Sequence, residues 1–161
     1  MRVVRVNSIR EFEAEGEMEI GTFVKVGSVI SISCGVYQQE DEISRYLGKA
    51  DVEKIRKFMP DLAEPKTFTK FYALMDTGAV EPVKMVRIGE EVKLMDEEEI
   101  VKSHTVNGEI RLPYLPFLMK RDRDLARSAV RRLMNMIPSQ KDIFEMILVE
   151  IEYSLLREVD A

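Results

Sequence analysis

The densest group of side chains that could bind a charged ligand lies between residues 120 and 132, in the segment KRDRDLARSAVRR. Its acids are Asp122 and Asp124, and its bases are Lys120, Arg121, Arg123, Arg127, Arg131 and Arg132. Arginine recognises phosphates and carboxylates through a planar fork of N–H donors. The segment therefore predicts contact with a nucleic-acid backbone or with an acidic protein surface, and these six bases form the candidate binding site.

The same arginines also have a structural interpretation. At helical spacing, Arg123, Arg127 and Arg131 form one stripe of the segment. The final segment of the chain is acidic and offers four partners: Glu145, Glu150, Glu152 and Glu158. A stripe of arginines facing these acids would form a salt-bridged helix pair inside the protein. Aromatic residues, on which single-stranded bases stack, are missing between 121 and 132. Both interpretations stay open.

Other residues that could do chemistry are few, and no catalytic residue is predicted. His104 is the only histidine and Cys34 the only cysteine, so a zinc site would need mostly carboxylate ligands, which is atypical. We expect His104 to contact the last carbonyls of a short helix, and Cys34 to pack as a buried thiol. The acidic run at 96–99 is explained by helix capping, because consecutive helical positions point in different directions. We predict no metal and no cofactor.

The usual sequence signatures of nucleotide and acyl chemistry are absent from the chain. It contains no GxxxxGK[ST], no GxGxxG and no GxSxG motif. The five tyrosines are scattered and form no readable constellation. An enzyme of unknown class, with a site built from carboxylates, arginine and tyrosine, is therefore kept as the last of the alternatives.

Length and composition indicate a globular domain in a reducing compartment. The chain has 161 residues, 45% of them apolar, with a formal net charge of −5. This charge does not favour electrostatic binding of DNA or membranes by the whole molecule. The N-terminal residues lack the apolar core of a signal peptide, and no apolar run approaches about 20 residues, so we expect a cytoplasmic protein with no membrane partner. Scarce amide residues beside abundant Glu, Lys and Arg favour a heat-adapted source.

Hydrophobic periodicity predicts an α+β fold: a small antiparallel β-barrel with a helical insertion and a C-terminal helix pair. We expect a barrel domain at 1–111, with the insertion at about 40–62, and a helical segment at 112–161 packed on or beside the barrel. The predicted strands cover 2–7, two stretches within 18–37, 67–75, 83–88 and 91–95. The stretch 111–119 contains too many prolines for a central strand.

Local signals locate several turns and caps. Gly27 is expected to supply a positive φ in a tight turn, and Gly35 to mark a bulge within a strand. Asp96, three residues before Glu99, predicts the start of a short helix. Asn107–Gly108 predicts a hairpin turn.

The final helix is apolar over an unusually wide arc. The residues expected to face inward are Ile143, Phe144, Ile147, Ile151 and Leu155. Met146, Leu148 and Leu156 widen this arc beyond what one packed face requires. Such a surface is either core or a docking face for another subunit. The sequence leaves both open.

The stretch EIGTFVKVGSVISISCGVY, residues 19–37, resembles the opening of the HAS barrel, the small β-barrel at the front of HerA-type ATPases and of rotary ATP synthase catalytic subunits. Residues 20–24 match its first element, IG-[ST]-[FY]-V, and Gly35 with Val36 match the G-V strand that follows. The later YALMDTG, at 72–78, and the segment 81–100 are similar to the pattern that continues the family's barrel. The resemblance covers about residues 3–104.

The resemblance implies a module that assembles subunits and contacts protein partners, with no chemistry of its own. The phosphate loop of the ATPase does not follow residue 104, so the resemblance implies a free-standing barrel. We therefore expect a non-catalytic adaptor that associates with itself, or with an ATPase or nuclease complex in DNA processing. The alternative is a nucleic-acid-binding protein that uses the arginine-rich helix at 121–132.

Overall fold

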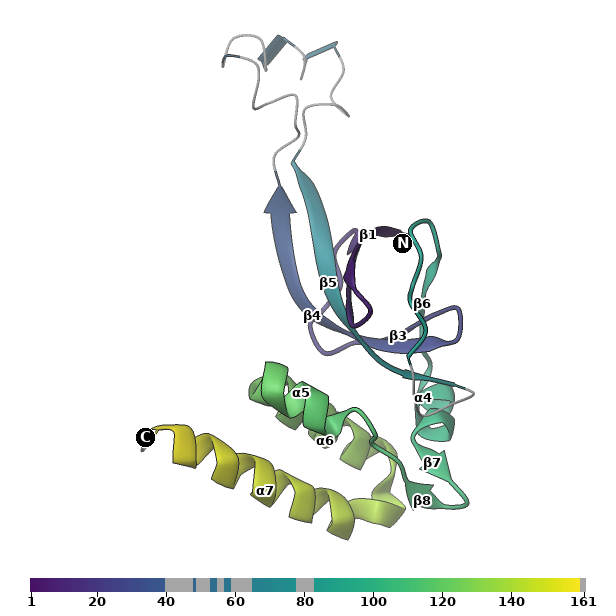
Figure 1. The fold of residues 1–161 in the computed structure, drawn as a ribbon, viewed down its shortest axis with the longest axis vertical. Coiled ribbons are helices and arrows are strands. Elements are labelled where there is room, and N and C mark those ends of the chain that lie inside the picture. Colours follow the sequence, from purple (N-terminus) through teal and green to yellow (C-terminus); the bar gives the residue numbers. More distant parts are fainter. Residues whose placement is uncertain (40–47, 49–52, 55–56, 59–64, 78–82, 160–161) are drawn as a thin grey trace.

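The computed structural model describes residues 1–39, 48, 53–54, 57–58, 65–77 and 83–159. These residues form a curled antiparallel sheet with a layer of helices against one side of it (Figure 1). The helical insertion predicted at about 40–62 lies almost entirely outside the described residues. No helix among the described residues combines the length and apolarity that crossing a bilayer requires.

Within the described part of the chain, six antiparallel strands form the main sheet, in the order β1-β2-β5-β4-β3-β6. The strands are β1 (Val3–Ser8), β2 (Glu11–Glu15), β3 (Phe23–Val26), β4 (Val29–Gln39), β5 (Lys66–Asp76) and β6 (Val92–Leu94). The long β4–β5 pair forms the centre of the sheet, and β1 and β6 form its two edges. Gly27 turns the chain between β3 and β4 with a φ of 59°, as expected.

The predicted α+β fold with an antiparallel sheet is confirmed, but the sheet curls into a half-barrel and does not close into the predicted barrel. Register shifts in the β4–β5 ladder, one of them between Ser33 and Gly35, increase the local twist and confirm the bulge predicted at Gly35. The two edges approach each other at Arg2 and Glu91, an isolated bridge flanked by a 2.9 Å hydrogen bond from Val3 N to Glu90 O. Strand β6 is three residues long, too short to extend this contact into a ladder with β1.

Each face of the sheet contributes to a core of its own, while the outer part of the β4–β5 pair is partly exposed. Side chains alternate between the two sides along a strand, so Phe23 faces one core and Val24 the other. The core enclosed by the curl holds Val3, Phe12, Ala14, Val24, Val26, Phe71, Ala73, Val83, Val86 and Val92. The core beneath the helices holds Phe23, Ile30, Ile32 and Leu74 together with the buried helical residues.

The helices follow the sheet in the chain and cover its outer side (Figure 1). They are α4 (Glu97–Ser103), α5 (Leu115–Arg121), α6 (Arg123–Met136), the 3-10 helix η1 (Pro138–Gln140) and α7 (Lys141–Val159). A small hairpin, β7 (Thr105–Val106) and β8 (Glu109–Ile110), lies between α4 and α5 and turns at Asn107 and Gly108. Helix α6 is the middle layer, because it packs against both the sheet core and α7.

Several local predictions are confirmed, one is wrong, and two elements were not predicted. The Asp96 side chain caps α4 by accepting a 2.8 Å hydrogen bond from Glu99 N. The segment 83–88, predicted as a strand, has no regular structure, and its Val83 and Val86 fill the interior of the curl. Strand β2 was not predicted, because its sequence EFEAE is mostly charged. Helix α5 was not predicted either, although Pro116 sits in its first turn, where proline is tolerated.

Candidate docking surface

The six basic residues predicted as a binding site lie on two helices. Lys120 and Arg121 end α5, and the others lie on α6. Asp122 separates the two helices and caps α6 by accepting a 3.0 Å hydrogen bond from Leu125 N. Side-chain exposure differs along the segment: Arg121 and Arg131 are exposed, whereas Arg123 and Arg132 are half-buried. The six bases are therefore not equivalent members of one surface.

Two of these arginines anchor the helices to the sheet. The Arg121 guanidinium lies 3.0 Å from Glu11 Oε1 on β2 and 5.6 Å from the centroid of the Phe117 ring. The Phe117 ring in turn meets Tyr72 of β5 edge to face. Arg132 donates a hydrogen bond to the carbonyl of Gly21, in the loop that leads into β3. These contacts hold α5 and α6 against the sheet.

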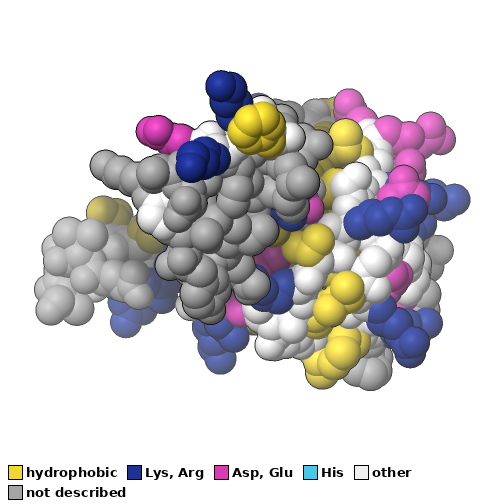
Figure 2. All heavy atoms as spheres, turned by 90° about the horizontal axis from the view of Figure 1, so that it is seen from above, with side chains coloured by type: hydrophobic (Ala, Val, Ile, Leu, Met, Phe, Trp, Pro, Cys, Tyr) yellow, Lys and Arg dark blue, Asp and Glu magenta, His cyan; other side chains and the backbone are white. Residues whose placement is uncertain are grey.

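Two further ion pairs of the segment lie within the helical layer. Arg127 is 3.0 Å from Asp124, one turn away on α6. Arg131 is 3.3 Å from Glu152 of α7. This contact is of the kind expected if the arginine stripe faces the acidic final helix. Figure 2 shows the molecule from the side away from the helical layer, and there basic and acidic side chains are interspersed among the described residues.

His104 is a buried structural residue at the end of α4. Its Nδ1 lies 2.7 Å from the carbonyl oxygen of Ile100, and its Nε2 lies 2.6 Å from the Tyr114 hydroxyl. Because a carbonyl only accepts, Nδ1 carries the proton and Nε2 accepts from tyrosine. Burial lowers the pKa of His104 from 6.5 to about 4 and raises that of Tyr114. The predicted contact of His104 with the last carbonyls of a helix is confirmed.

Cys34 is half-buried on β4 and is chemically quiet. Burial is the largest cause that raises the pKa of its thiol, to about 12, and the nearby Glu11 raises it further. The reactive thiolate form is therefore scarce at neutral pH. Cys34 borders a small cavity of about 120 Å³ with Glu11, Lys70 and Tyr72. Among the described residues, no group of three His, Cys, Asp or Glu side chains is arranged to hold a metal ion.

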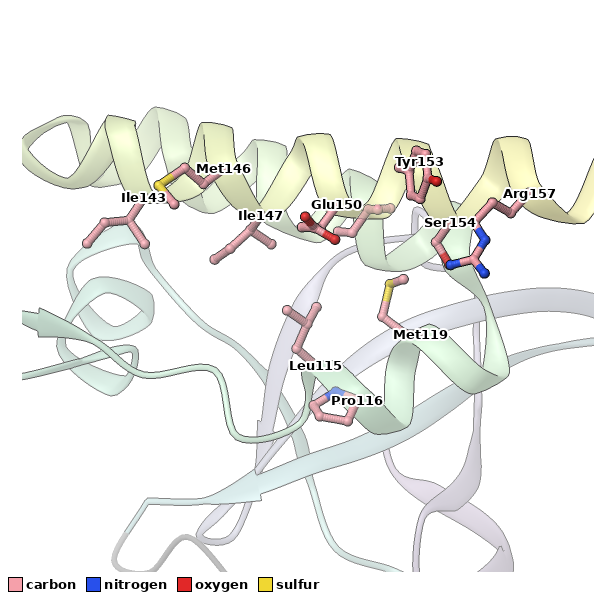
Figure 3. Close-up of a pocket in the computed structure, with 11 residues that line it drawn as sticks. Leu115, Pro116, Met119, Ile143, Met146, Ile147, Glu150, Tyr153, Ser154 and Arg157 are labelled. Carbon is pink, nitrogen blue, oxygen red and sulfur yellow. The ribbon is translucent and has the colours of Figure 1, made fainter.

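A larger hollow lies between α5 and α7 and is mainly apolar. Its volume is about 670 Å³, and Figure 3 shows Leu115 and Met119 of α5 and Ile147 of α7 pointing toward the space between the two helices. Three polar side chains of α7 also line it: Glu150, Ser154 and Arg157. The α5 side of this groove was not predicted from the sequence, because the prolines in 111–119 argued against a regular element there.

The outward side of α7 continues this apolar surface. Phe144 and Ile151 point inward and are buried, whereas Met146 is 71% exposed and Tyr153 is 59% exposed. The large apolar residues exposed on α7 are Ile143, Met146, Val149, Tyr153 and Leu156. We call the four residues Met146, Val149, Tyr153 and Leu156 the outer face of α7. Met146 and Leu156 were expected in the wide apolar arc, whereas Val149 and Tyr153 were not, although their helical spacing gave the signal.

Comparison with known proteins identifies no relative of this chain. No family model matches the chain, and no curated protein matches it.

Proposed function

We propose that the protein is a non-catalytic assembly module that binds a protein partner through the outer face of α7. The observation that carries the proposal is the exposure of four large apolar side chains in one row on a helix whose opposite side is already buried. A surface helix that lies on a core normally exposes a polar face. Contiguous exposed apolar surface of this kind is typical of protein–protein interaction sites.

The distribution of polar groups supports the same proposal. The described residues hold no metal cluster, the one histidine is buried against Tyr114, and the one thiol has a raised pKa. None of these groups is poised for acid–base or nucleophilic chemistry. The resemblance to the HAS barrel agrees with this role, since that family's barrel serves assembly; an ATPase or nuclease complex in DNA processing is the partner that it suggests.

Nucleic-acid binding through the arginine-rich helix has less support. Arg121, Arg127 and Arg131 each make an ion pair with a carboxylate of the chain. A phosphate would have to compete with these acids for the same guanidinium groups. Fluorescence anisotropy with single- and double-stranded oligonucleotides at two salt concentrations separates the two functions, because phosphate-driven affinity falls steeply with salt. We expect no binding at low salt.

The proposed docking face is tested by replacing two of its residues, Met146→Ser and Tyr153→Ser, in one variant. Ile88→Ser is the matched control, because Ile88 is 69% exposed and lies in the turn that precedes β6, more than 50 residues before α7 in the chain. Light scattering coupled to size-exclusion chromatography measures assembly, and thermal unfolding checks the fold. We expect the double variant to lose assembly while the control keeps it.

The proposal is overturned if the unchanged protein stays monomeric at every attainable concentration and recovers no partner that depends on Met146 and Tyr153. It is also overturned if the Ile88 control loses assembly as completely as the double variant.

A further inference from the structure

We infer that the occupant of the outer face of α7 is the same helix of a second copy of this chain, packed antiparallel across a two-fold axis. The inference rests on the proposed docking function and names the partner. Helix α7 is the outermost helix of the layer, and its C-terminal part extends past the neighbouring helices (Figure 1). A second helix can therefore lie alongside it without meeting the sheet.

The spacing of the apolar residues fits helix pairing. Met146, Val149, Tyr153 and Leu156 follow one another at intervals of three, four and three residues. This is the a/d pattern by which two helices interlock along a seam. The inward side of α7 is occupied by contacts of Phe144 and Ile151 within the protein's own core. The seam is therefore a second apolar face, separate from the one that folds the chain.

The charges beside the seam select a second copy as the partner. Glu150 and Arg157 both lie on the groove side of α7 and are seven residues apart, which is two helical turns, or about 10 Å. Neither makes an ion pair with any described residue of the chain. A two-fold axis passing between Tyr153 and Ser154 places Glu150 of each copy level with Arg157 of the other. The same surface patch on each copy then forms two equivalent Glu150–Arg157 ion pairs, as an isologous interface requires.

A parallel arrangement is less complementary. In a parallel pair, the residues that flank the seam meet five positions apart, so Glu152 of one copy faces Arg157 of the other, but Glu145 faces Glu150. Glu152 is already paired with Arg131 of its own chain. Like charges placed together oppose association. The charge pattern therefore favours the antiparallel pair over the parallel one.

The antiparallel arrangement also defines the centre of the interface. Tyr153 lies next to the two-fold axis and meets its own counterpart there. Its ring is already covered on one side by the Arg157 guanidinium, at 5.6 Å from the ring centroid. Aromatic residues near the middle of an interface commonly contribute most of its affinity. The arrangement thus places the largest exposed side chain of α7 where it would bury the most surface.

Charge reversal tests this inference directly. Glu150→Lys makes both flanking positions basic, and Arg157→Glu makes both acidic. We expect each single variant to weaken self-association at least tenfold, measured by sedimentation of the full chain. Mixing the two single variants is expected to restore association as a heterodimer, and the double variant E150K/R157E is expected to associate with itself. Glu98→Lys, at an exposed position of α4, is the control and is expected to change nothing.

Three results overturn the inference. If the protein self-associates but neither charge variant changes it, the contact lies elsewhere. If both singles weaken association and their mixture does not recover it, the antiparallel register is wrong. If the protein is monomeric but α7 binds a different protein in a manner that depends on Tyr153, the inference fails while the proposed docking function stands. Circular dichroism of each variant confirms that the exposed substitutions leave the fold intact.

Discussion

Helices α6 and α7 lie side by side and present their side chains to water in opposite ways. Helix α6 buries Leu125, Ala129 and Leu133 on one side, and Arg127 and Arg131 on its other side contact carboxylates of the chain. Helix α7 also buries one side, through Phe144 and Ile151, but its other side exposes Met146 and other large apolar residues. The exposed side of α6 therefore finds ion-pair partners within its own chain. Helix α7 has an apolar face that the described residues of its own chain leave uncovered, and we propose that this face serves docking while the opposite one serves folding.

The largest expected effect separates the two sides of α7. Phe144→Ala removes a fully buried ring and should lower the free energy of unfolding by about 3–5 kcal/mol. Tyr153→Ala removes an exposed ring and should change the stability of the monomer by no more than about 0.5 kcal/mol. Urea denaturation at low protein concentration measures both. Equal losses would mean that the two sides of α7 both belong to the monomer core.

Acid should destabilise the core beneath the helices, where His104 contacts Phe23 and Tyr114. The pKa of His104 is lowered to about 4 in the folded protein, so between pH 6.5 and 4 the unfolded chain binds a proton that the folded chain does not. Stability is therefore complete above pH 6.5 and falls as the pH drops to 4, by about 3 kcal/mol. Because His104 is the only histidine, its NMR titration reports the pKa directly. A midpoint near 6.5 would contradict the buried position.

Tyr114→Phe should have a smaller effect on the same core. The substitution removes the hydroxyl that lies 2.6 Å from His104 Nε2 and keeps the ring. A buried acceptor left without its donor costs about 1–3 kcal/mol. The measurement is thermal or urea unfolding at pH 8, where His104 is neutral in both states. Tyr153→Phe, which removes an exposed hydroxyl, is the matched control and should be neutral.

Arg131→Ala should have the smallest effect and would sharpen the contrast between the helices. The ion pair of Arg131 with Glu152 joins α6 to α7, but both side chains are more than half exposed. Exposed pairs contribute about 0.2–1 kcal/mol. A double-mutant cycle with Glu152→Ala isolates the pair. A coupling free energy above that range would mean that the ion pair contributes substantially to the packing of α6 against α7.

Local signals made much of the secondary structure predictable. Asp96 as a cap, Gly27 as a turn and Asn107–Gly108 as a hairpin each depend on residues within a few positions of one another. Helices 123–136 and 141–159 were predicted because their apolar residues recur at helical intervals. Strand β2 and helix α5 were missed, since EFEAE is dominated by charge and the LPYLP stretch by proline, and their identities depend on neighbours distant in sequence.

The candidate site was less predictable, because long-range contacts decide it. Arg121 meets Glu11 and Arg132 meets Gly21, partners more than 100 residues away. The sequence showed that α7 was apolar over a wide arc, but which part of the arc faces α6 follows only from packing. The open sheet has the same origin, since closure depends on pairing between the region of Arg2 and that of Glu91.

The long β4–β5 ribbon projects away from the helices (Figure 1). Each of its strands has 11 residues and so reaches about 35 Å. Tyr37 stacked on Phe68, with Lys70 over the Tyr37 ring, stiffens its outer part. A fluorophore attached at Lys66, where β5 begins, would lie far from α7. It would report on association through α7 without blocking that surface.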